Sequence, residues 1–215
     1  MKYILLIISM FNILFFGCMK PQIKDSLTAT SHFYKDMTVT ILSNNPEDKK
    51  FAKCLQSELK EDLPELKIIS EDTFRNNLFP WFEPGIAPKD AKGLSALLSK
   101  AMVRKHIDSL GVKILVYVHG ETVQGELGGP GFCGGGYGGA GCLGYVSAER
   151  ETNITTTVWN LEKVVSMGTT DIHYQGAIRV PMFIIPLPIP VFTESTACSE
   201  TAKRISDCIK NKESL

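Results

Sequence analysis

A glycine-rich stretch framed by two strand-like segments is the feature that most constrains how this chain folds. Residues 125–144 hold eleven glycines in twenty positions. The apolar run Ile114–His119 precedes this stretch and the alternating run Ala148–Trp159 follows it, a pattern typical of two strands. The stretch lacks the Lys-Ser/Thr ending of a phosphate-binding loop, and no helix start follows it. We therefore predict a hairpin tip, in which Phe132 and Tyr137 are candidate partner-contacting residues.

The remaining patterns predict a single α/β domain over residues 36–212, with a mixed β-sheet and flanking helices. Asn45-Pro46, followed by two acidic residues, is a helix start, and the helix should end near Asp62 because Pro64 follows. Strands on either side of this helix predict a βαβ unit at the start of the domain. The expected strands are 37–43, 66–70, 114–118, 150–159 and 164–180, and the expected helices are 45–62, 94–110 and 193–210.

The first eighteen residues predict export and lipid attachment. Residues 1–17 combine Lys2 with an apolar run of signal-peptide length, too short to span a bilayer comfortably. The sequence Phe15-Phe16-Gly17-Cys18 resembles the lipobox of bacterial lipoproteins, although that family prefers Leu and a small residue where the two phenylalanines stand. An ordinary secretory signal and an uncleaved anchor are the alternatives.

This resemblance implies a mature chain that starts at an acylated Cys18. Several acyl chains hold a protein firmly at a membrane. Met19 follows the cysteine, and by resemblance to enteric-type sorting this implies an outer-membrane lipoprotein facing the periplasm. Residues 18–35 contain few apolar side chains, so we expect a tether between the lipid and the domain.

Cysteines in an exported chain can form disulfides, and five follow Cys18. Cys133 and Cys142 lie in a glycine-rich segment that can bring them together, so we predict a bridge between them. Cys198 and Cys208 on one helix would be about 15 Å apart and cannot pair with each other. One of the two can reach Cys54 if the first and last helices pack side by side.

The order of elements resembles the TolB N-terminal-like fold. That fold is shared by penicillin-binding-protein activator lipoprotein B and by the curli secretion lipoprotein. The resemblance rests on the strand that ends the run Leu110–Val118 and on the hairpin segment Thr155–Leu161, and it covers about residues 36–210. Asn160 stands where the family usually has Asp, and the glycine-rich stretch lies outside the common pattern. The family has no catalytic residues to carry over.

Candidate chemistry is scarce elsewhere in the sequence. The 23 basic and 23 acidic residues balance, so no basic surplus indicates nucleic-acid binding. No nucleophile motif is present, so we expect no enzyme, although Glu121, Glu149 and Glu151 near the glycine-rich stretch leave a hydrolase as a minor alternative. We expect neither a cofactor nor a metal site, because no ligand-type spacing relates the histidines His32, His106, His119 and His173.

The apolar run 180–192 contains four prolines and cannot form a regular core element. It is expected to be a buried crossing to the last helix or a partner surface that includes Ile185 and Ile189. Together these features predict a non-catalytic, membrane-anchored envelope lipoprotein that binds a protein partner in envelope assembly. A subunit of an oligomeric secretion assembly, and hence a homo-oligomer, is the alternative; its discriminating feature would be a long amphipathic hairpin.

Overall fold

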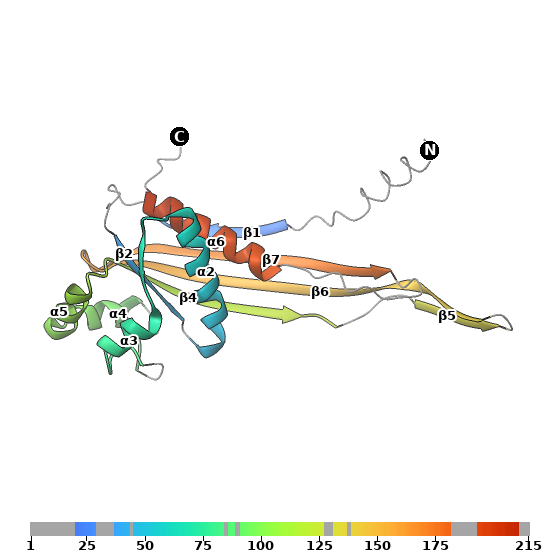
Figure 1. Ribbon diagram of the computed structural model, residues 1–215, viewed down its shortest axis with the longest axis horizontal. Coiled ribbons are helices and arrows are strands. Elements are labelled where there is room, and N and C mark those ends of the chain that lie inside the picture. Colours follow the sequence, from blue (N-terminus) through green and yellow to red (C-terminus); the bar gives the residue numbers. More distant parts are fainter. Residues whose placement is uncertain are drawn as a thin grey trace.

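The computed structural model describes residues 20–28, 37–43, 45–83, 86–88, 91–126, 131–136, 139–181 and 193–210. These residues form a single α/β domain with one mixed sheet, as predicted (Figure 1). Cys18, Tyr137, Ile185 and Ile189 lie outside the described residues. The main sheet has the strand order β1 (Lys20–Asp25), β7 (Val165–Pro181), β6 (Gly139–Asn160), β4 (Ile114–Gln124), β2 (Thr38–Ser43) and β3 (Lys67–Ile69).

The predicted βαβ unit is confirmed, since β2 pairs in parallel with both β3 and β4. The helix between β2 and β3 begins as the 3₁₀ turn η1 (Pro46–Asp48), for which Asn45 is the N-cap residue, and continues as α2 (Lys49–Asp62). Proline at the first position fixes a helical φ angle without losing a needed donor, which explains this start. The helix ends at Asp62, as the proline two residues later predicts.

The region after β3 holds three short helices. α3 (Glu71–Asn77) is capped by Ser70, whose hydroxyl accepts a bond from the Thr73 amide. The single helix expected over 94–110 is wrong: two helices, α4 (Ala91–Leu98) and α5 (Ala101–Leu110), are separated by a break at Lys100, which has extended angles. Gly111 ends α5 with φ +67°, the left-handed conformation that favours glycine.

Two hydrophobic cores lie on opposite faces of the sheet. α2 and α6 (Thr193–Lys210) lie side by side on one face, whereas α3, α4 and α5 cover one end of the other face (Figure 1). The alternation predicted along β6 is confirmed, because Ile154 and Val158 belong to the first core and Trp159 belongs to the second. A disulfide between Cys54 of α2 and Cys198 of α6 closes the first core, which settles the alternative left open by the sequence.

Two segments differ from expectation. Lys20–Asp25 was expected in the tether, but it forms β1 and pairs antiparallel with β7, from Lys20 opposite Gln175 to Asp25 opposite Thr170. The glycine-rich stretch was expected to be only a hairpin tip. Instead β5 (Gly131–Gly136) pairs with residues 139–144 of β6. A backbone ladder needs no side chains, so periodicity could not reveal these strands.

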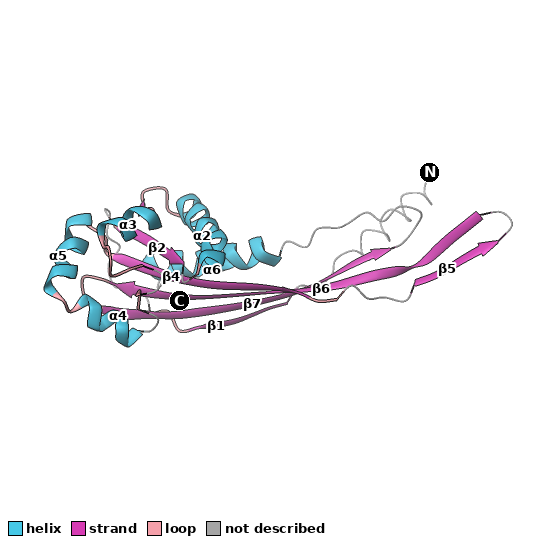
Figure 2. Ribbon diagram, turned by 90° about the horizontal axis from the view of Figure 1, so that it is seen from below, coloured by secondary structure: helices cyan, strands magenta, loops and turns pink. Residues whose placement is uncertain are grey.

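Strands β6 and β7 are 22 and 17 residues long and extend well beyond the helices. Figure 2 shows β5 at the far end of this extension, on the opposite side of the molecule from α4 and α5. A turn over residues 161–164 joins β6 to β7. Within the part of the chain that the structure describes, no helix is long and apolar enough to cross a membrane.

Candidate functional site

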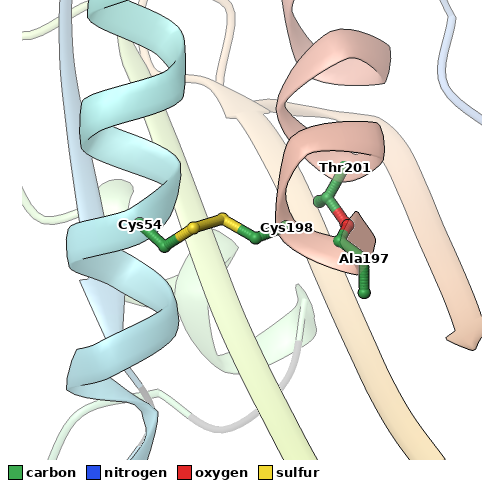
Figure 3. Close-up of a disulfide and its surroundings, with 4 residues drawn as sticks. All are labelled: Cys54, Ala197, Cys198 and Thr201. Carbon is green, nitrogen blue, oxygen red and sulfur yellow. A yellow bond between two sulfur atoms is a disulfide. The ribbon is translucent and has the colours of Figure 1, made fainter. Parts of the chain in front are cut away.

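The candidate site is the arm, which we define as β5 with residues 139–151 of β6 and 175–181 of β7. The arm begins at the level of Thr193, the first residue of α6, beyond which this helix no longer covers the sheet. At that level the buried hydroxyl of Thr152 donates to the Thr193 hydroxyl at 2.9 Å. From this level the arm runs outward (Figure 2). A disulfide between Cys54 and Cys198 joins α2 to α6 (Figure 3).

An ion-pair cluster lies at the base of the arm. The Glu194 carboxylate accepts bonds from Lys50 Nζ at 2.8 Å and from the Arg150 guanidinium at 2.9 Å. Partial burial raises the pKa of Glu194, but the bonds from Lys50 and Thr122 and the charge of Arg150 outweigh it, so the net pKa lies below the ordinary value. This cluster joins α2 and α6 to β6 at the base of the arm.

The candidate residues of the glycine-rich stretch lie at the outer end of the arm. Phe132 is opposite Leu143 in the β5–β6 ladder, and Cys133 is opposite Cys142. Directly opposed residues of an antiparallel pair have Cα atoms about 4.5–5.5 Å apart, which is within the range that a disulfide requires. The bridge between Cys133 and Cys142 stays a prediction.

The sheet face opposite α2 and α6 is polar along β6 and β7. Asn153 and Asp171 are exposed, and Thr155 and Thr157 are partly exposed. Thr157 lies within hydrogen-bond distance of the Thr169 hydroxyl, 3.4 Å away. These are ordinary cross-strand pairs, in which one hydroxyl or amide bonds to the next.

A second cluster lies at the carboxyl end of β2. Glu71 accepts a bond from the Ser43 hydroxyl at 2.7 Å and from Arg75 Nε at 2.8 Å. Arg75 also donates to the backbone carbonyls of Ser43 and Phe82, which ties α3 and the following loop to the sheet. Burial raises the pKa of Tyr117, whose hydroxyl has no hydrogen-bond partner among the described residues.

Sequence reasoning missed the central role of Asp48 and interpreted it only as an acidic residue in a helix start. Its carboxylate is almost fully buried and accepts bonds from the backbone amides of Asn45 and Gly120, at 3.0 and 3.1 Å. His119 Nδ1 lies 3.2 Å from the same carboxylate. Asp48 therefore joins the start of α2 to β4. The helix-start pattern could have indicated the cap, but not the contact with β4.

The three carboxylates flagged near the glycine-rich stretch lie on the strands at the arm's base. Glu121 on β4 and Glu149 on β6 are exposed, and Glu151 on β6 is partly exposed. Among the described residues, no group of three His, Cys, Asp or Glu side chains is placed to hold a metal ion. The bonded carboxylates found above all join helices to the sheet.

No protein-family model matches the chain, and no curated protein matches it. Among solved structures, the PelC dodecamer from Paraburkholderia phytofirmans is 10% identical, with 89% of this chain and 97% of that chain covered and a TM-score of 0.37. A neuraminyllactose-binding hemagglutinin homologue from Helicobacter pylori is 12% identical, with 89% and 90% covered and a TM-score of 0.34. Lipoprotein GNA1162 from Neisseria meningitidis is 7% identical, with 82% and 99% covered and a TM-score of 0.29. These TM-scores are too low to transfer a function to this chain.

Proposed function

We propose that this chain is a non-catalytic envelope lipoprotein, held at the outer membrane through Cys18, that binds a protein partner through its arm. The observation that carries this proposal is the open edge of β7. Its ladder with β1 ends at Lys20 opposite Gln175, and β7 continues to Pro181 with no described strand on that outer side. An unpaired strand edge offers a row of backbone donors and acceptors to a partner strand.

The described polar clusters favour binding over catalysis. Asp48, Glu71 and Glu194 each accept several bonds that hold a helix to the sheet. A general base needs a carboxylate or imidazole that is within reach of a substrate and not already saturated by the fold. A screen of the purified protein with hydrolase substrates tests this directly, and turnover that survives stringent purification would support the hydrolase alternative.

The anchor is tested by Cys18→Ser. Lipid attachment requires the Cys18 sulfur, so the variant should lose palmitate labelling and either leave the membrane fraction or accumulate as an uncleaved precursor. Cys208→Ser, which changes a cysteine far from Cys18 in the sequence, is the matched control and should keep both the label and the membrane fraction. Labelling and fractionation that Cys18→Ser leaves unchanged would show that the chain is not a lipoprotein.

The partner is tested by crosslinking inside the intact envelope. A photo-crosslinking residue at Ala177, on the part of β7 beyond its described pairing with β1, should capture one protein reproducibly. The same probe at Met102 is the control, because this residue is 63% exposed and belongs to α5 at the opposite end of the molecule. Equal capture from both positions, or capture no better than with an unrelated lipoprotein, would count against partner binding through the arm.

A second candidate function is a subunit of an oligomeric secretion assembly. The length of the β6–β7 hairpin favours it, because a long amphipathic hairpin is the discriminating feature expected for this class. The faces of this hairpin are rich in threonine rather than cleanly apolar, which counts against it. The free edge of β7 would then pair with the arm of another copy. Native mass spectrometry of the detergent-extracted protein should show a closed oligomer, and monomer alone would end this candidate.

A further inference from the structure

We propose that the outer end of the arm lies in the headgroup layer of the bilayer that holds Cys18. This inference rests on the lipid anchor of the proposed function and adds a second membrane contact, made by strands. The surface consists of β5, residues 139–148 of β6 and the last residues of β7. Three features of the described residues coincide there: a boundary in charge, the position of the anchor and open strand edges.

The first feature is the charge boundary. No Lys, Arg, Asp or Glu occurs from residue 127 to residue 148, and none occurs between Arg179 and Glu194. The ladder places these boundaries at one level of the sheet, because Glu149 is opposite Ala177 and Arg179 is opposite Ser147. Glu126 marks the same boundary beside β4, because it follows Gly125, whose amide donates to the Glu149 carbonyl. Beyond Glu126, Glu149 and Arg179, no described residue of the arm carries a charge. An end without charged side chains can settle into the interface without placing a charge against the hydrocarbon layer.

The second feature is the position of the anchor. Lys20 is opposite Gln175, and Gln175 is opposite Glu151. Cys18 precedes Lys20 by two residues, so its Cα lies within about 7 Å of the Lys20 Cα. The charge boundary at Glu149 and Arg179 is two to four residues farther along the same strands, or about 7–13 Å at 3.3 Å per residue. The acyl chains and the charge-free end thus reach the bilayer together.

The third feature decides how the arm lies. From Glu149 to Gly139 the strand is about 33 Å long, enough to cross the hydrocarbon layer if it stood upright. The outer edge of β7 beyond Gln175 has no described partner strand, and unpaired backbone groups are strongly disfavoured in hydrocarbon. In the headgroup layer, water and headgroups satisfy those backbone groups of this edge that no partner strand pairs. The arm of one copy therefore lies along the interface, where aromatic residues such as Phe132 and Tyr145 are favoured.

The experiment uses the full lipidated chain in vesicles of phosphatidylethanolamine and phosphatidylglycerol. A tryptophan probe replaces Leu143 (Leu143→Trp), and bromine atoms carried by the lipid, near the headgroup or at the ends of the acyl chains, quench its emission. Tyr145→Trp is a second probe in case the first variant fails to fold. The native Trp81 and Trp159 belong to the opposite end of the molecule and serve as the background. Met102→Trp is the matched control on the exposed face of α5.

We expect the emission of Leu143→Trp to fall strongly with bromine near the headgroup and only slightly with bromine at the ends of the acyl chains. The emission of Met102→Trp should fall with neither. Vesicle flotation of the wild-type protein tests the lipid anchor separately from the position of the arm. Protein that floats while both arm probes stay unquenched would overturn this inference and leave the anchor intact. Quenching as strong from the chain ends would also overturn it, because the arm would then cross the bilayer. If the wild-type protein fails to float, it is not anchored to the bilayer, and the inferred position of the arm is wrong as well.

Discussion

Cys54 and Cys198 form a disulfide between helices whose cysteines are 144 residues apart in sequence, with Cα atoms 6.3 Å apart (Figure 3). A crosslink that closes so long a loop removes much of the conformational entropy of the unfolded chain. In the chain-entropy model its loss lowers the free energy of unfolding by about 4–5 kcal/mol. We expect Cys198→Ala, or reduction of the wild type, to lower Tm strongly in thermal unfolding followed by circular dichroism.

Cys208→Ala is the control for this measurement, because it removes the other cysteine of α6. Cys208 is a buried free thiol whose pKa is raised to about 11 by burial and by the nearby charge of Asp25. The folded protein should therefore resist alkylation at Cys208 near neutral pH, since the thiolate is the reactive form. Cys208→Ala retains the Cys54–Cys198 bridge, so reductant should lower its Tm as it lowers the Tm of the wild type. If reductant leaves the wild-type Tm unchanged, the Cys54–Cys198 bridge does not stabilise this fold.

Gly120 lies directly beneath the ring of Phe51, where α2 crosses β4. A Cβ atom added at Gly120 would come within 2.3 Å of Phe51 Cδ2, and this ring is fully buried in the core. We expect Gly120→Ala to lower the free energy of unfolding by about 1–3 kcal/mol, the usual range for overpacking. Val123→Ala, at a half-exposed position of the same strand, should change it far less in urea titration. Equal midpoints for the two variants would contradict the close approach.

The Glu71–Arg75 pair should be tested as a unit, because the side chains of both residues are only 13% and 12% exposed. Arg75→Met leaves the Glu71 carboxylate without its charged partner, and we expect a loss of roughly 3 kcal/mol. The double variant Glu71→Gln/Arg75→Met removes the uncompensated charge and should recover part of that loss. A double-mutant cycle in urea measures this coupling. If the losses in free energy of unfolding caused by Glu71→Gln and Arg75→Met simply add up in the double variant, the interaction between the two side chains contributes nothing to stability.

The Glu194 cluster predicts a pH dependence of stability. The pKa of Glu194 in the folded protein lies below the ordinary value of 4.5, so the folded state favours the charged carboxylate. The stabilisation is present above the ordinary pKa and is lost as the pH falls through the lowered value. We expect Glu194→Gln to be less stable than the wild type by about 0.5–1 kcal/mol near pH 7, because the cluster is only partly buried.

The difference between wild type and Glu194→Gln should stay constant down to about pH 5 and shrink below the ordinary pKa. Glu61→Gln, at an exposed position of α2, is the matched control and should show no such trend. Tm measured across this pH range for the three proteins checks the prediction. A difference that grows as the pH falls would have the wrong sign for a lowered pKa.

Cys133 and Cys142 carry the remaining disulfide prediction. A bridge between residues nine apart closes a short loop. In the chain-entropy model it raises the free energy of unfolding by roughly 2–3 kcal/mol. Peptide mapping of the non-reduced protein should recover both cysteines in one crosslinked fragment. Two free thiols at these positions would exclude the bridge and leave the backbone ladder of β5 and β6 to hold the end of the arm.

The sequence alone determined the elements whose signals are local. The cap at Asn45-Pro46, the left-handed end at Gly111 and the closing helix Thr193–Lys210 all follow from the conformational preferences of a few neighbouring residues. Alternation up to Trp159 indicated a strand, because side chains along a strand point to opposite faces with a period of two residues. The single α/β domain and the parallel start of the sheet follow from the order of these elements.

Only the tertiary structure decided which distant segments meet. The pairing of Lys20–Asp25 with β7, the choice of Cys198 over Cys208 for Cys54, and the contact of Asp48 with Gly120 all join residues far apart in sequence. Periodicity carries no information about such pairs. Glycine-rich β5 was hidden for a related reason: its ladder is made by backbone groups, and residues without side chains leave no pattern from which a strand or its partner can be inferred.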